Sequence, residues 1–310
     1  MSTLPHRPVL LEETVEALAV QPDGIYIDGT FGRGGHARAV LARLGPAGRL
    51  VGLDRDPAAL MAARDLERID PRFVAVQRPF GEIADAVAAV GVTGRVQGIL
   101  LDLGVSSPQL DDPGRGFSFG SDGPLDMRMD PSRGRSAAQW LAAASQGEIA
   151  RLLKEYAEER FAARIARAVV QQRTKAPLMT TGALAELVAR VVPTREPGKH
   201  PATRTFQALR IQVNDELGEL RRCLDQVCGL LAVAGRLAVI SFHSLEDRVV
   251  KRFMRDESRG PRLPKGVPVT GDQASGRLRI LGKPVRPSDA EVAINPRSRS
   301  AILRVAERLS

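Results

Sequence analysis

The sequence of 310 residues predicts an α/β fold in which a mostly parallel sheet, covered by helices, is interrupted by an all-helical insert. Short apolar runs alternate with helical stretches from about residue 25 to 105, which is the rhythm of a parallel sheet. Residues 110–205 then combine a glycine- and proline-rich loop with helical, strand-poor sequence, and strand character returns after residue 235. We therefore expect a sheet domain in two parts, residues 1–109 and 206–310, around a helical insert of residues 110–205 that recognises the substrate.

The first strand, residues 25–28, ends in Asp28 and leads into a glycine-rich turn that opens a helix. Glycines let the backbone of such a turn approach a ligand closely, and the helix that follows presents free N–H groups. This arrangement predicts a nucleotide-like cofactor at the turn. The alternative is a structural turn that binds nothing.

Asp28 helps to identify the cofactor. Because Gly32, Gly34 and Ala37 also satisfy the dinucleotide pattern, a nicotinamide-dependent oxidoreductase stays open as an alternative. A dinucleotide does not require an acid at that strand end, whereas the sulfonium and amino-acid tail of S-adenosylmethionine give the acid a cationic partner. The sequence has no Tyr-x-x-x-Lys pair either, so S-adenosylmethionine is the better fit.

The second strand, residues 50–54, ends in Asp54, twenty residues after Gly34. This spacing suits a carboxylate that binds ribose hydroxyls. An alanine-rich helix follows, and apolar runs at 73–77 and 96–103 predict the third and fourth strands.

A polar loop follows the fourth strand at the sheet edge where ligands bind in such folds. Methyl transfer to an exocyclic amine requires acceptors for the amine hydrogens, so that the nitrogen lone pair can point at the methyl group. Ser106, Ser107 and the carbonyl before Pro108 can supply them. The loop resembles the start of the polar-Pro-Pro-aromatic loop of DNA amino-methyltransferases, but Gln109 and Leu110 replace its last two residues. Stacking on the base must therefore come from elsewhere.

The remaining elements are a helical region and three strands. Apolar residues recur at helical spacing through residues 148–172, as expected for a helical module. Residues 235–241 and 301–306 predict two further strands, with a partner near 278–281, and residues 257–275 read as an exposed loop.

Bulk composition limits the class of protein. The formal net charge of +9 and the pI near 10.3 favour a polyanionic partner, so a noncatalytic RNA-binding or ribosome-assembly protein is a third interpretation. Cys223 and Cys228 are too few and wrongly spaced for a zinc site or a disulfide framework, and we expect them to be packing residues. No segment resembles a signal peptide or a membrane span, so the expected location is cytoplasmic, without membrane contact.

Six motifs in order resemble the RsmH (MraW) family of bacterial ribosomal RNA methyltransferases over nearly the whole chain. The motifs are His6-Arg-Pro-Val-Leu-Leu-Glu12, Asp28-Gly-Thr-Phe-Gly-Arg-Gly-Gly-His36, Asp102-Leu-Gly-Val-Ser-Ser-Pro-Gln-Leu-Asp111, Gly123-Pro-Leu-Asp-Met-Arg-Met-Asp130, His200-Pro-Ala-Thr-Arg-Thr-Phe-Gln207 and Ser241-Phe-His-Ser-Leu-Glu-Asp-Arg248. The resemblance implies a class I, Rossmann-like methyltransferase sheet of seven mostly parallel strands. It also implies S-adenosylmethionine as cofactor and, as substrate, the exocyclic N(4) amine of a cytidine in the decoding region of 16S rRNA, within the small ribosomal subunit. A homodimer is compatible with the sequence.

The resemblance also implies a set of cofactor contacts, all of which are present in this sequence. They are Gly34, Gly35, His36, Asp54, Phe80, Asp102 and Gln109, and they add to Asp28, which the sequence pattern itself indicates. For His36 we expect positioning and no proton transfer, and for Phe80 the alternative is a core aromatic. We expect the amine nitrogen to attack the methyl carbon directly, which needs no metal and no covalent enzyme intermediate. Neither cysteine lies in a loop after a strand, where a nucleophilic cysteine would be expected.

Contacts to RNA are predicted from basic residues. We expect Lys199 and Arg204 in the loop 199–204, and Arg248, Lys251 and Arg252 in a later basic run, to contact phosphates. The helical insert would recognise the shape of folded RNA. His243 would lie near the target base, and its alternative is a loop histidine that is hydrogen-bonded to its own turn.

Overall fold

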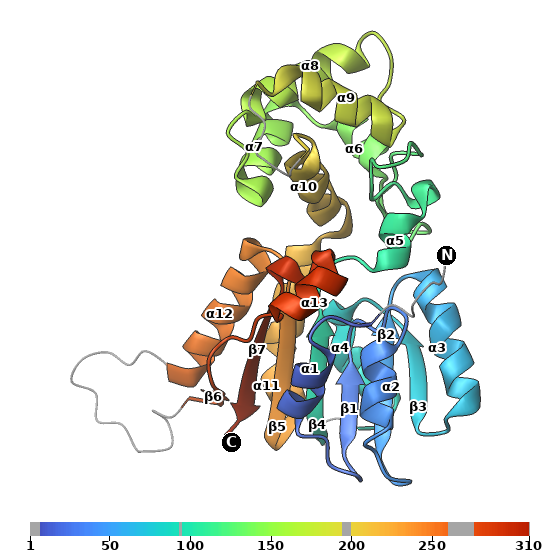
Figure 1. Ribbon diagram of the computed structural model, residues 1–310, viewed down its shortest axis with the longest axis vertical. Coiled ribbons are helices and arrows are strands. Elements are labelled where there is room, and N and C mark those ends of the chain that lie inside the picture. The colour runs from blue at the N-terminus through green and yellow to red at the C-terminus, as the bar shows by residue number, and fades with distance from the viewer. Residues whose placement is uncertain (1–6, 93–94, 194–199, 260–275, 310) are drawn as a thin grey trace, which may run out of the picture. The chain divides into compact units, whose positions relative to one another are not determined.

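The structure is a computed structural model that describes residues 7–92, 95–193, 200–259 and 276–309. The chain forms two compact units, described separately below (Figure 1). The sheet unit comprises Met1–Gly104 and Leu217–Ser310, and the helical unit comprises Val105–Glu216.

The sheet unit contains seven strands in the order β3-β2-β1-β4-β5-β7-β6. The strands are β1 Ile25–Asp28, β2 Arg49–Asp54, β3 Phe73–Gln77, β4 Val96–Asp102, β5 Leu231–Ser241, β6 Leu278–Ile280 and β7 Ile302–Arg308. Strands β1 to β5 are parallel, while β7 runs antiparallel to both β5 and β6. The predicted strands and the mostly parallel, seven-stranded sheet are confirmed, although β5 begins four residues earlier than the 235–241 run indicates.

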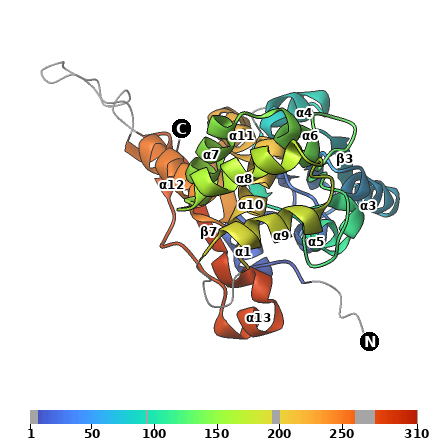
Figure 2. The ribbon, with the colours of Figure 1, turned by 90° about the horizontal axis from the view of Figure 1, so that it is seen from above.

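Helices cover both faces of this sheet (Figures 1 and 2). On one face the apolar side chains of α1 Leu11–Leu18, α2 Gly35–Leu41 and α3 Pro57–Ile69 pack with alternate residues of the strands. The other face packs against α4 Ile83–Ala89, α11 Glu216–Leu230 and α12 Ser244–Arg259. Because both faces are covered, the strands read as nearly continuous apolar runs.

Cys223 and Cys228 both lie in the core of the second face, with 0% and 3% of their surfaces exposed. Burial raises the pKa of both thiols above the ordinary range. Their prediction as packing residues is confirmed.

The helical unit has one apolar core, to which each of its longer helices contributes. Its helices are α5 Ser107–Asp111, α6 Ala137–Ala143, α7 Gln146–Ala157, α8 Ala162–Arg173, α9 Thr181–Val191 and α10 Thr203–Asn214. The periodic region 148–172 is divided between α7 and α8 at Glu158, whose φ of 49° lies in the left-handed region. The division lets the two helices pack against each other.

The compact helical unit is larger than the insert expected at 110–205. Val105 and Leu110 pack against its core, and α10 contributes Phe206, Ala208 and Leu209 to the same core. These apolar contacts extend the unit at both ends. No helix among the described residues has the length and apolar character needed to cross a membrane.

Candidate functional site

Three aspartates end three neighbouring strands of the sheet unit. Asp28 ends β1, Asp54 ends β2 and Asp102 ends β4. Since β1 lies between β2 and β4 and all three strands are parallel, their carboxylates share one edge of the sheet. This is the edge at which doubly wound folds bind ligands.

The glycine turn after β1 is held by Asp54. Its Oδ2 accepts a hydrogen bond from Gly32 N at 2.8 Å, and its Oδ1 accepts one from Asp56 N at 2.9 Å. Gly34 has a φ of +72°, and a Cβ there would lie 2.5 Å from the ring of Phe31. A side chain at position 34 would therefore require the turn to move, which explains why glycine is needed.

Thr30 connects two of the aspartates. Its backbone N–H donates to Asp28 Oδ1 at 3.1 Å, and its hydroxyl oxygen accepts a hydrogen bond from Asp102 N at 2.6 Å. Sequence reasoning assigned Thr30 no role, although the D-x-T pattern contained the signal. Thr30 thus fixes the spacing between the ends of β1 and β4.

His36, at the start of α2, is buried and lies beside Asp102. Its Nε2 lies 3.2 Å from the Val9 carbonyl, which can only accept, so Nε2 carries the hydrogen. The Nδ1 lone pair then faces Asp102 Oδ2 at 3.6 Å. Burial lowers the pKa of His36 to about 4, so the ring is neutral at pH 7. These contacts support a positioning role.

Asp102 has an unusual environment among the described residues. Its Oδ1 is buried and has no hydrogen-bond partner in the part of the chain that the structure describes. Burial, together with the charges of Asp28 and Glu246, raises the pKa of Asp102 well above its ordinary value. A buried polar atom normally has a partner, so Oδ1 indicates a place for a ligand.

The donor set of this edge fits S-adenosylmethionine. Burial raises the pKa of Asp28 to about 7 and also raises that of Asp54. Buried carboxylates with raised pKa values are stabilised in their ionised form by a nearby cation or hydrogen-bond donor. The sulfonium, the ammonium and the ribose hydroxyls of this cofactor are such groups.

The pKa of Asp28 predicts a pH dependence of cofactor binding. Below about pH 7 the acid is mostly protonated in the free protein, and pairing with a cation requires it to release that proton. Affinity for S-adenosylmethionine should therefore rise with pH up to about pH 7, by up to about tenfold per unit for this acid. Calorimetric titrations between about pH 5.5 and 8.5 would measure this. A flat affinity across that range would contradict the assignment of Asp28.

Phe80 begins the short helix η1 Phe80–Glu82 and is half-buried against the core of the sheet unit. It also lies next to the turn, because a Cβ added at Gly29 would be 3.5 Å from Phe80 Cβ. Part of the Phe80 side chain packs in the core, as the alternative interpretation expects. Its contact with adenine stays a prediction.

The polar loop after β4 belongs to the helical unit and forms the N-terminus of α5. Ser106 and Gln109 make a capping box, in which Ser106 N donates to Gln109 Oε1 at 2.9 Å. Gln109 is 7% exposed, so it has a structural role that the S-x-x-Q spacing could have indicated. Ser107 and Pro108 are the first residues of the helix. Their roles toward the cofactor and the amine stay predictions.

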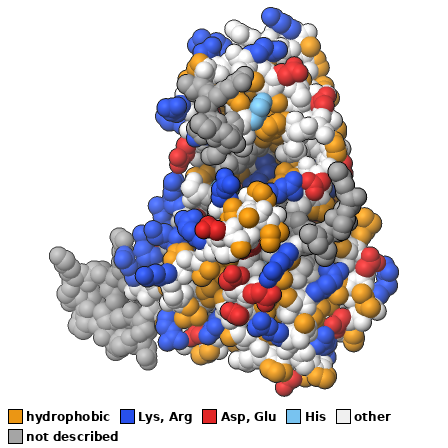
Figure 3. Space-filling model, in the orientation of Figure 1, with side chains coloured by type: hydrophobic (Ala, Val, Ile, Leu, Met, Phe, Trp, Pro, Cys, Tyr) orange, Lys and Arg blue, Asp and Glu red, His pale blue; other side chains and the backbone are white. Residues whose placement is uncertain are grey.

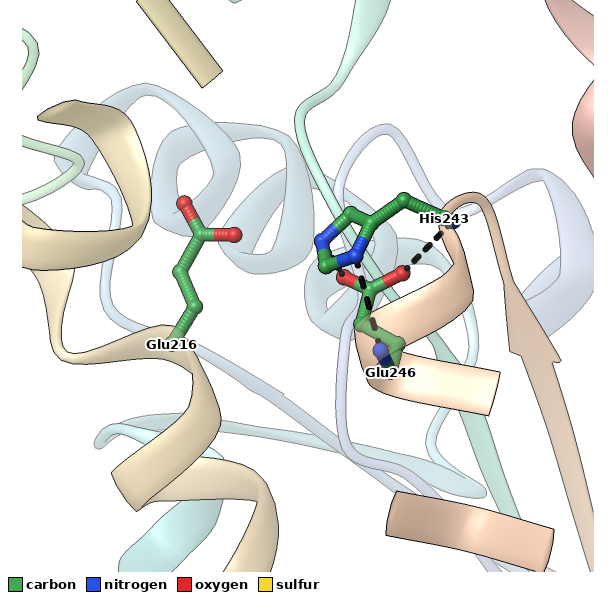
Figure 4. A group of neighbouring side chains, drawn as sticks. All are labelled: Glu216, His243 and Glu246. Atoms are coloured by element: carbon green, nitrogen blue, oxygen red, sulfur yellow. Dashed lines mark hydrogen bonds and ion pairs between the residues drawn. The ribbon is translucent and has the colours of Figure 1, made fainter. Parts of the chain in front are cut away.

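His243 caps α12 at the carboxyl end of β5, together with Glu246 (Figure 4). Glu246 N donates to His243 Nδ1 at 3.4 Å, and His243 N donates to Glu246 Oε2 at 3.3 Å. His243 is thus hydrogen-bonded within its own turn, and its position near the target base stays a prediction. Glu246, which is 2% exposed, was missed by sequence reasoning, although the H-x-x-E spacing resembles a capping box.

The exposed face of α12 is basic. Positions 248, 251, 252, 255 and 259 follow helical spacing, and all five side chains are exposed, whereas Val250 and Met254 face the core. Figure 3 shows Lys and Arg side chains gathered over this helix. Arg204 lies in the first turn of α10, and Lys199 lies outside the described residues.

A family model and a curated relative agree on a family. A model of the MraW methylase family matches residues 3–309. The ribosomal RNA small subunit methyltransferase H of Thioalkalivibrio sulfidiphilus (strain HL-EbGR7) is 62% identical over 306 residues, which cover 98% of each chain. Among solved structures, an rRNA methylase from Streptococcus thermophilus aligns with 11% identity and a TM-score of 0.44, over 99% of this chain and 100% of that chain. A precorrin-6y C5,15-methyltransferase from Geobacter metallireducens aligns with 10% identity and a TM-score of 0.43, over 100% and 94% of the two chains.

Proposed function

The chain belongs to the MraW methylase family, and from this premise we propose that it methylates the exocyclic N(4) amine of a cytidine in the decoding region of 16S rRNA. S-adenosylmethionine is the methyl donor. The substrate is the RNA within the small ribosomal subunit, and the reaction takes place in the cytoplasm. The observation that carries the proposal is the edge where Asp28, Asp54 and Asp102 meet the glycine turn.

When bound, the cofactor supplies an electrophilic methyl group on a positively charged sulfur. Asp28 and Asp102 would hold its cationic groups, while Asp54 would bind the ribose hydroxyls and fix the turn at Gly32. His36, held by the Val9 carbonyl, would line the site beside Asp102. Asp28, His36 and the Oδ1 atom of Asp102 are buried, so water competes weakly for these groups.

Transfer to the amine is a direct displacement. The nitrogen lone pair would accept the methyl group that the cofactor supplies, and the amine would then release one proton. Ser106, Ser107 and the Ser107 carbonyl would accept hydrogen bonds from the amine and orient its lone pair. Phe80 would pack beside the adenine, with Gly34, Gly35 and Gln109 as further cofactor contacts.

The basic face of α12 is proposed to contact RNA phosphates through Arg248, Lys251 and Arg252. Exposed basic side chains at helical spacing can follow a polyanion along one surface, and their binding releases counterions. Arg204 and Lys199 are proposed as further phosphate contacts, and His243 as a neighbour of the target base. Analytical ultracentrifugation of the purified chain would show whether it forms the homodimer with which the sequence is compatible.

Two measurements test this function. Titration with S-adenosylhomocysteine and with NAD should show saturation by the first ligand alone at micromolar concentration, whereas saturation by NAD would favour the oxidoreductase. Isolated small subunits should then incorporate labelled methyl groups, and nucleoside analysis should recover N(4)-methylcytidine. Binding of subunits without any methyl incorporation would favour a noncatalytic assembly protein.

A further inference from the structure

The structure contains a group of aromatic rings in the helical unit that the proposed reaction does not use. The ring centroids of Phe119 and His200 are 4.8 Å apart, with an angle of 38° between the rings. Phe119 also meets Phe206 edge-on, with centroids 4.7 Å apart. Phe206 is only 4% exposed, so it anchors the group in the core of the unit.

The group is graded from buried to exposed. Phe206 is buried, Phe119 is half-buried against the same core, and His200 is exposed. The exposed His200 ring packs on Phe119, which in turn packs on Phe206, so one face of the aromatic group is presented to solvent. Phe, Trp and Tyr make up only 4% of the residues, so two phenylalanines behind one exposed histidine ring call for an explanation.

Hydrogen bonds at the N-terminus of α10 hold the His200 ring in place. The ring Nδ1 accepts a hydrogen bond from Ala202 N at 3.1 Å, and the His200 carbonyl accepts one from Thr203 N at 3.0 Å. Because Nδ1 accepts, the neutral ring carries its hydrogen on Nε2. A ring that is already ordered loses little entropy when a ligand stacks on it.

The electrostatic surroundings favour a nucleotide over a neutral apolar ligand. The ring adjoins the N-terminal end of α10, the positive end of a twelve-residue helix, and Ala202 at the cap position has no side chain that could neutralise it. The chain as a whole carries a net charge of +9. A base on the rings would place its phosphates in this positive field.

We infer that Phe119, His200 and Phe206 form a platform on which an unpaired base of the substrate RNA stacks. This inference rests on the proposed function and names a recognition site for it. The loop after β4 has Gln109 and Leu110 where DNA amino-methyltransferases have a proline and an aromatic residue, so it offers no ring for a base. The platform supplies stacking from the helical unit, in the manner of proteins that bind single-stranded RNA.

The test is stacking of a short single-stranded RNA that carries one 2-aminopurine, whose fluorescence falls when the base stacks. The full-length chain should quench the probe. His200→Ala should bind it about 5- to 100-fold more weakly and lose the quenching, since a stacked base contributes that range of affinity. His200→Phe keeps a ring and should bind within about threefold of the parent chain. Phe119→Leu should lose part of the quenching.

Controls separate stacking from folding and from charge. Met179→Ala changes a 58% exposed apolar side chain of the same unit and should bind the probe like the parent chain. Thermal unfolding of each variant shows whether it is folded, and if Phe119→Leu is not, the two His200 variants decide. Stacking releases no counterions, so the factor for His200→Ala should be the same at low and high salt.

Two results would overturn the platform. The first is His200→Ala quenching and binding the probe like the parent chain. The second is His200→Phe losing binding and quenching as His200→Ala does. The hydrogen bond from Ala202 N to the His200 ring, which phenylalanine cannot make, would then account for binding instead of the aromatic ring. Methylation of small subunits by the parent chain tests the proposed function separately. If the parent chain does not methylate but the His200 pair differs as expected, the reaction is wrong and the platform stands.

Discussion

Asp102→Asn is expected to weaken S-adenosylmethionine binding about 100- to 1,000-fold and to stabilise the cofactor-free protein. The carboxylate Oδ1 is buried and has no partner among the described residues, and the pKa of Asp102 is raised by burial and by neighbouring carboxylates. An amide of the same shape removes that electrostatic cost but cannot pair with the sulfonium or ammonium. Calorimetric titration and thermal unfolding of the same two proteins measure both effects.

The stabilisation should depend on pH in a definite direction. Because the pKa of Asp102 is raised in the folded protein, folding retains a proton that the unfolded chain releases above about pH 4. The contribution of Asp102 to stability therefore falls as pH rises from about 4 to the folded pKa. The asparagine variant lacks this loss, so its advantage in unfolding temperature should grow over that window.

Asp70→Asn is a matched control with the opposite sign. The guanidinium of Arg72 donates two hydrogen bonds to Asp70, at 2.9 and 2.6 Å, and thereby lowers the pKa of Asp70. Its loss should reduce stability slightly and leave cofactor affinity unchanged. If Asp102→Asn also lowered stability and kept its affinity, Asp102 would be a structural residue and the proposed site would be wrong.

Replacement of Arg248, Lys251 and Arg252 by alanine is expected to weaken binding to small ribosomal subunits about 100-fold at 0.1 M salt. Each lost phosphate contact should lower the slope of log affinity against log salt by about 0.7 to 0.9. The three together should lower it by about 2 to 3, so the difference should vanish near 1 M salt. Binding isotherms at several salt concentrations measure the slope directly.

A second triple variant controls for net charge. Arg64 and Arg68 on α3, and Arg95 just before β4, are also exposed, and their replacement by alanine removes the same charge. Arg64 and Arg68 pair with Glu67 and Asp65 at the surface, where ion pairs contribute little stability. Equal loss of affinity in both triple variants would mean that α12 is no special contact surface. Cofactor binding should be unchanged in both.

The sheet was predictable because its signals are local. Each strand is an apolar run that ends in a polar residue or a turn. A strand that is buried on both faces is apolar along its whole length, so it can be found in the sequence without knowing which strands lie beside it. The boundaries of the helical unit were harder to predict from the sequence. Val105 and Leu110 join the helical core through contacts with residues far away in sequence, which no local pattern records.

The candidate site divides in the same way. Asp28, Asp54 and Asp102 were found because each ends an apolar strand. The contact between His36 and Val9, and the link that Thr30 forms between β1 and β4, depend on how separate segments pack, so sequence reasoning missed them. The aromatic group was also invisible, since Phe119 and His200 are neighbours only after folding.

The division of the sheet unit into two chain segments has a consequence for its biosynthesis. In the finished sheet β4 lies between β1 and β5, yet β5 follows the entire helical unit in the chain. While the ribosome is still translating that unit, one edge of β4 has no strand paired with it. Such an unpaired edge can form hydrogen bonds with other nascent chains. The helical unit, made of one continuous segment, can complete its own core during this interval. Its early folding shortens the time for which the half-made sheet stays vulnerable to aggregation.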